Sequence, residues 1–123
     1  MTFRRILALL AAILVLGVVV AAQQNVPVVA DMQRVSFNNP IHAGDALLPA
    51  GNYEVKHVME GQNHIMVFRQ LGVRKGFEAR IKCNLVPLKA KAEQTQKVYV
   101  LNAASEPVLQ ELIFKGENAA HVF

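Results

Sequence analysis

The stretch FEARIKCNL, residues 77–85, alternates apolar and polar side chains without a break. Its apolar positions are Phe77, Ala79, Ile81, Cys83 and Leu85, and its polar positions are Glu78, Arg80, Lys82 and Asn84. Successive side chains of a strand point to opposite faces, so this alternation is typical of an antiparallel strand with one buried face and one solvated face. The stretch therefore predicts a sheet whose apolar side covers a core.

Further segments of strand type lie on both sides of this stretch. They are MQRVSF (32–37), NYEVKHVM (52–59), HIMVFR (64–69), KVYVLN (97–102), PVLQELIFK (107–115) and AAHVF (119–123). Turn residues such as Gly44-Asp45 and Gly61-Gln62-Asn63 separate them. Only PLKAKAEQTQ (87–96) could form a helical turn or two. The sequence predicts an all-β domain, a small antiparallel β-sandwich or partly open barrel of six to eight short strands.

The N-terminus has the three-part layout of a secretory signal peptide. Arg4 and Arg5 precede an apolar run, and the small residues Ala21 and Ala22 precede two glutamines. We expect residues 1–22 to be a signal peptide cleaved after Ala22, and residues 23–123 to form a single domain without a transmembrane segment. The alternative is a retained anchor, although residues 6–22 are near the lower limit for spanning a bilayer.

The location follows from export and from the cysteine content. Cys83 is the only cysteine, so no disulfide can form within the chain and stability must come from packing. A cysteine-poor exported domain fits the periplasm or the extracellular side of a bacterium. We expect Cys83 to be a buried core thiol, with an intermolecular disulfide or a nucleophilic role as the alternatives.

Positive charge is concentrated in one part of the chain. Residues 69–91 contain seven lysines and arginines against Glu78 alone. Arg80 and Lys82 share the polar face of their strand. The segments on either side of it add Arg74, Lys75, Lys89 and Lys91. This pattern predicts a basic face that binds anionic envelope lipid, acidic polysaccharide or an acidic protein, and a merely solvated strand face is the alternative. Export and the lack of a recognition module argue against nucleic acid.

The segment ALLPAGNYEV, residues 46–55, predicts a sharp structural turn rather than a ligand loop. Pro49 presets the turn, and Gly51 supplies a left-handed conformation. Tyr53 then packs its ring inward while its hydroxyl finds a partner at the rim. A phosphate-binding loop would need several glycines before a helix, which this segment lacks.

The longer segment FNNPIHAGDALLPAGNYEV, residues 37–55, resembles the opening of small exported bacterial β-domain proteins. The shared features are F-x-x-P followed by L-P-A-G-x-Y. The resemblance implies a β-sandwich or barrel-like fold in an exported protein, and it brings no catalytic residue.

Two histidines form the only candidate metal site in the sequence. If the segments 52–59 and 64–69 form a hairpin with an even number of loop residues, His57 and His64 share a face with Met59 and Met66. Imidazoles bind zinc or copper, and thioethers suit reduced copper. The alternative is that these histidines border the core and bind nothing, because the pairing depends on register and no third ligand has an obvious spacing.

Enzymatic chemistry has little support in the sequence. The glutamates, among them Glu54 and Glu117, are expected singly on outward faces or turns. Ser36 and Ser105 lack the glycine flanks of a nucleophile elbow. The sequence predicts a non-enzymatic binding or structural module of the cell envelope that needs no cofactor. The alternatives are a periplasmic metal-binding protein using His57 and His64, and a hydrolase with an unrecognised site.

Overall fold

The structure, a computed structural model, describes residues 27–123, and the predicted signal peptide lies outside the described residues. The described residues contain no helix and form nine strands. These are β1 (Met32–Phe37), β2 (Ile41–Ala43), β3 (Ala46–Leu48), β4 (Gly51–Glu60), β5 (Asn63–Gln70), β6 (Glu78–Pro87), β7 (Gln96–Leu101), β8 (Pro107–Ile113) and β9 (Ala119–Val122). The predicted all-β class is confirmed. The part of the chain that is described holds no helix of the length and hydropathy needed to cross a membrane.

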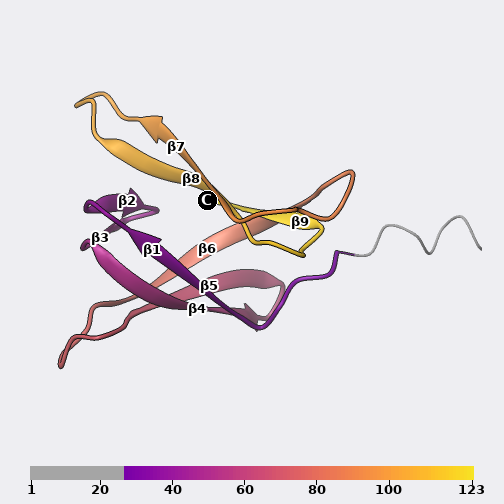
Figure 1. The fold of residues 1–123 in the computed structure, drawn as a ribbon, viewed down its shortest axis with the longest axis horizontal. Coiled ribbons are helices and arrows are strands. Elements are labelled where there is room, and N and C mark those ends of the chain that lie inside the picture. Colours follow the sequence, from indigo (N-terminus) through magenta and orange to yellow (C-terminus); the bar gives the residue numbers. More distant parts are fainter. Residues whose placement is uncertain (1–26) are drawn as a thin grey trace, which may run out of the picture.

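The strands form one mixed sheet that is not closed into a barrel (Figure 1). Their order is β1-β4-β5-β6-β9-β8-β2-β3, and β7 pairs with β8. The pairings are antiparallel except between β2 and β8, where His42 lies opposite Val108 in parallel orientation. The sequence did not predict β2 and β3, because three-residue strands are too short to show an alternation. The strand count therefore exceeds the predicted six to eight.

Strand β6 belongs to both halves of the folded sheet. Its first part, through Cys83, pairs with β5, and its last part, from Asn84 onward, pairs with β9. The half of the sheet that contains β9, β8, β2 and β3 folds back over β6, so that β3 contacts β6. A Cβ atom at Gly44 would lie only 2.8 Å from Ile81 Cγ2, so this close approach requires a glycine. The core fills the space between the two halves.

Aromatic and aliphatic side chains make up this core. The largest fully buried side chains are Tyr53, Phe68, Phe114, Leu48, Met66, Leu109, Leu112, His121 and Val55. The Tyr53 ring packs edge-on against Phe37 and Phe68, with centroid distances of 5.8 and 6.4 Å. Its hydroxyl donates a hydrogen bond of 2.5 Å to the Pro49 carbonyl. The predicted inward ring and rim-bonded hydroxyl are thus confirmed.

Gly51 adopts a different conformation from the one predicted. Its φ is +150°, whereas the left-handed helical region lies near +57°. A positive φ of this size still favours glycine, because L-residues rarely adopt it. A Cβ atom there would also meet Gln70 Nε2 at 3.0 Å. The turn requires glycine at position 51, and the backbone there is more extended than the predicted left-handed helical conformation.

The connection between β6 and β7 is a loop, so residues 87–96, the one segment that the sequence left open to a helical turn, form none. Its backbone bonds to the β8–β9 turn instead. Leu88 N–H donates to Asn118 O at 2.8 Å, and Ala92 N–H donates to Glu117 O at 2.9 Å. Because these groups are satisfied by another part of the chain, the segment gains nothing from local helical bonds.

Candidate metal-binding site

The β4–β5 hairpin places two histidines side by side. Met59 lies opposite His64, and His57 lies opposite Met66. His64 Nδ1 and His57 Nε2 are 3.1 Å apart and share a hydrogen bond. The two rings are nearly parallel, with centroids 5.1 Å apart and planes inclined by 13°. The predicted register, with both histidines on one face, is confirmed.

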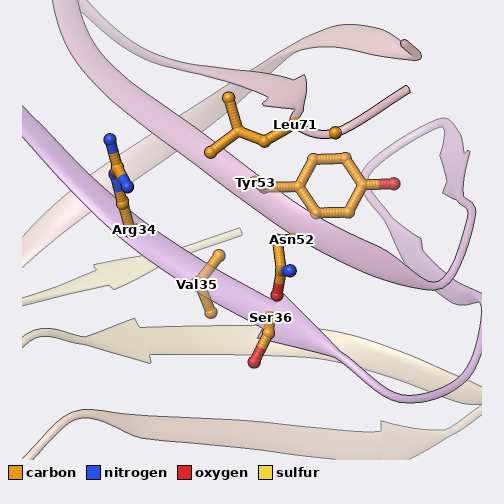
Figure 2. A pocket seen from close by; sticks show the side chains of 7 residues that line it. Arg34, Val35, Ser36, Asn52, Tyr53 and Leu71 are labelled. Carbon is orange, nitrogen blue, oxygen red and sulfur yellow. The ribbon is translucent and has the colours of Figure 1, made fainter. Parts of the chain in front are cut away.

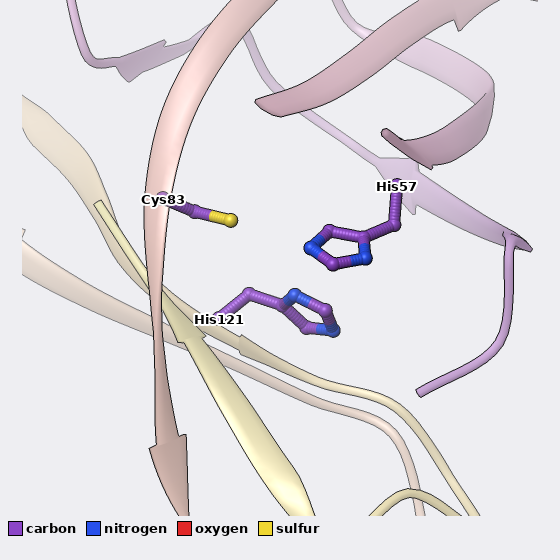
Figure 3. Close-up of side chains that lie close together, drawn as sticks. All are labelled: His57, Cys83 and His121. Carbon is purple, nitrogen blue, oxygen red and sulfur yellow. The ribbon is translucent and has the colours of Figure 1, made fainter. Parts of the chain in front are cut away.

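Two further donors reach the same place from other strands. Cys83 lies opposite His64 in β6 and is 5% exposed, which confirms the predicted burial of its thiol. His121, in β9, is 1% exposed, and its ring lies edge-on to that of His57 at a centroid distance of 5.3 Å. One donor atom each from His57, Cys83 and His121 lie within 4.8 Å of one another. Figure 3 shows the sulfur and the two rings turned toward a common space.

Glu117 fixes the orientation of the His121 ring. The carboxylate, 3% exposed, holds His121 Nε2 at 2.8 Å through Oε1. Its other oxygen accepts hydrogen bonds of 2.9 Å from the Ala30 N–H and from Gln33 Nε2. A carboxylate accepts but does not donate, so the proton in this bond lies on His121 Nε2, and Nδ1 is the ring nitrogen left to meet another group. Among the described residues, this buried Nδ1 has no hydrogen-bond partner.

Burial favours the neutral forms of two of the donors, His57 and Cys83. Burial, followed by the neighbouring His121 and His64, lowers the pKa of His57, so this imidazole keeps its lone pair at neutral pH. Burial raises the pKa of the Cys83 thiol to about 11. A cation bound at the sulfur would displace the thiol proton, as metals do at cysteine ligands.

Imidazole nitrogen and thiolate sulfur are the donors that zinc and copper prefer in proteins. The bond lengths of tetrahedral zinc, about 2.0–2.1 Å to nitrogen and about 2.3 Å to sulfur, place its ligand atoms roughly 3.3–3.8 Å apart. The donor atoms of His57, Cys83 and His121 lie within 4.8 Å of one another. Side-chain rotations would therefore have to bring them closer together around one ion.

Sequence reasoning identified one of the three donors, His57, but paired it with His64, which is not among them. It expected a buried core thiol at Cys83 and did not consider it as a metal ligand, gave His121 no role and assigned Glu117 to solvated surface. The last assignment is wrong, because Glu117 is buried, and so is Glu54. The alternation of residues 77–85 turns Cys83 inward, and this was the one feature of the sequence that pointed toward its place in the cluster. No local pattern announces His121 or Glu117.

The predicted basic residues are spread along β6. Arg80 and Lys82 are both exposed on its outward side, and Arg80 pairs with Glu60 of β4. The other four lie in the loops at the two ends of this strand, Arg74 and Lys75 before it and Lys89 and Lys91 after it. Ten residues of β-strand separate these loops by about 30 Å. Anion binding by this face stays a prediction.

A surface hollow lies elsewhere, along β1 and β4 (Figure 2). It has a volume of about 430 Å³. Arg34 and Ser36 on β1 and Asn52 on β4 line it, and Leu71 follows β5 at its edge. Arg34 is its only charged side chain, so it contains no acid–base or metal-binding group of the kind found around His121.

Comparison with protein-family models, with curated proteins and with solved structures finds no match to this chain. The resemblance carried by residues 37–55 accordingly stays a prediction.

Proposed function

We propose that this protein binds one zinc or copper ion through His57, Cys83 and His121. The observation that carries the proposal is His121 Nδ1. This nitrogen is buried, held in place by the bond from Nε2 to Glu117, and has no hydrogen-bond partner among the described residues. It lies on the side of the ring that faces His57 and Cys83 (Figure 3).

An unpaired buried nitrogen is costly, by about 1–3 kcal/mol. Native structures rarely keep such groups without a reason. A bound ion would offset this cost, because the lone pair of Nδ1 would become a ligand.

The alternative that the histidines merely border the core explains only part of the geometry. His57 and His64 satisfy one another through their shared hydrogen bond. That pairing leaves His121 without a partner for Nδ1. It also gives no reason for a thiol to converge on the same space from a third strand. The metal site accounts for the convergence of the three donors, and an ion at His57 Nε2 would replace the hydrogen bond from His64.

A carboxylate behind the histidine supports the same role. Metal-binding histidines usually bond through their second nitrogen to a carboxylate or carbonyl, which fixes the ring and raises its basicity. Glu117 occupies this position behind His121. Together with the predicted export, these contacts support an exported metal-binding module.

A zinc titration of the metal-free protein tests the proposal. With a chromophoric chelator as competitor, we expect one ion per chain. Separate Cys83→Ser and His121→Ala variants should bind at least about tenfold more weakly, because each loses a ligand. His42→Ala is the matched control, since His42 bonds to Glu106 outside the cluster. Failure to bind one equivalent, or equal affinity in wild type and His121→Ala, would rule out the site.

A further inference from the structure

The point at which β6 changes its partner leaves an opening next to the metal site. Cys83 lies opposite His64 in β5, whereas the next residue, Asn84, lies opposite Val122 in β9. Strands β5 and β9 therefore flank different parts of β6. A cleft of about 290 Å³ occupies the space around this change of partner, and both His64 and Cys83 line it.

We propose that this cleft binds a small anion, such as a carboxylate or another small oxyanion, which coordinates the metal ion as an external ligand. The inference rests on the proposed metal site. It adds a ligand-binding position and a class of ligand to that site.

The number of protein donors favours an external ligand. Zinc takes four ligands in most proteins, and a site with three protein ligands completes its coordination with water or a bound molecule. His57, Cys83 and His121 are three. Cys83 is the one member of this set that also lines the cleft, so we place the fourth position on the cleft side of its sulfur. His64, whose Nδ1 is 3.1 Å from His57 Nε2, lines the same cleft.

The charge and hydrogen-bonding groups of the cleft favour an anion. Lys82 is the only lysine or arginine that lines it, and none of its lining side chains is an aspartate or glutamate. The other polar lining groups are the carboxamides of Gln62, Asn63 and Asn84. Carboxamides and ammonium groups donate hydrogen bonds to oxyanions. A small anion would thus meet the metal ion on one side and these donors on the other.

Cobalt(II)-loaded protein provides the test, because the visible spectrum of cobalt reports changes among its ligands. Azide and acetate serve as the probes in separate titrations. We expect each to change the spectrum with a saturable dependence on concentration. Lys82→Gln should raise the apparent dissociation constant about fivefold, as expected for loss of one solvent-exposed charge contact. Lys82→Arg should retain most of the affinity.

Arg80→Gln is the matched control, because Arg80 lies on the same outward face but does not line the cleft. This variant should leave the azide affinity unchanged. Asn84→Leu, which removes a donor and narrows the cleft, should weaken both anions and gives a second measurement that does not depend on the lysine.

Three results would overturn the inference. If cobalt binds but neither anion alters its spectrum, His64 or another protein group completes the coordination and the cleft takes no ligand. If the anions bind but Lys82→Gln and Asn84→Leu leave their affinity unchanged, they reach the ion from elsewhere. If cobalt does not bind, the proposed metal site itself fails, and the loading step shows this before any anion is added.

Discussion

Glu117 and His121 are joined by a hydrogen bond of 2.8 Å between two almost completely buried side chains. The same carboxylate accepts hydrogen bonds from the Ala30 N–H and from Gln33. One side chain therefore links the segment around β1 to the turn before β9 and to the candidate metal ligand. The stability of the fold and the geometry of the site depend on the same group.

Replacing this carboxylate should affect both properties. In Glu117→Gln an amide group must replace one acceptor oxygen, and it would face either the donors from Ala30 and Gln33 or the donor of His121. We expect a loss of about 1–3 kcal/mol in the unfolding free energy of the metal-free protein. Zinc affinity should fall about 10- to 100-fold.

Urea unfolding and a zinc titration measure these two effects. Glu93→Gln is the control, because Glu93 is exposed in the loop between β6 and β7. If Glu117→Gln has the stability and affinity of this control, the buried carboxylate has neither role.

The corner at Gly51 supplies a prediction about the fold alone. Valine at this position must adopt a φ near +150° and must displace the Gln70 side chain. We expect Gly51→Val to destabilise the domain by about 1–3 kcal/mol. The neighbouring Ala50→Val, at an exposed position, should change stability by less than about 0.5 kcal/mol. Equal melting temperatures for the two variants would show that the glycine conformation is not required.

Alkaline pH should lower the unfolding free energy of the metal-free protein, because the Cys83 thiol is buried. Burial raises the pKa of this thiol from 9.0 to about 11. The unfolded chain loses the thiol proton first, so the stabilising contribution is complete below pH 9 and is lost as the pH rises through 11. In Cys83→Ala this contribution is absent, so its stability should fall less over the same range. The test is the unfolding free energy of the wild type and of Cys83→Ala, measured at several pH values. If the two free energies fall in parallel as the pH rises, the thiol is not buried in its neutral form.

The predicted export makes a separate prediction about the start of the mature chain. Cleavage after Ala22 gives a protein that begins at Gln23, with or without cyclisation of that glutamine. The intact mass of exported material measures this directly. A full-length mass in the membrane fraction would instead indicate a retained anchor.

Local patterns predicted the strands better than the site. The alternation of residues 77–85 gave the inward position of Cys83, and the short turn at Gly61 gave the register that joins His57 to His64. Both follow from neighbouring residues. The return of β9 beside β6, with His121 opposite Leu85, is a long-range pairing that no local pattern specifies. Single-residue alternation likewise gives no sign that Glu117 is buried, because its partners Ala30 and Gln33 are far away in the sequence.

X-ray absorption at the zinc edge tests the proposed coordination most directly. For the zinc-loaded protein we expect one sulfur at about 2.3 Å and the remaining ligands, nitrogen or oxygen, at about 2.0–2.1 Å. In Cys83→Ser the sulfur shell should disappear. A spectrum with only nitrogen and oxygen ligands in the wild-type protein would contradict the account, because it would place the ion away from the space shared by His57, Cys83 and His121.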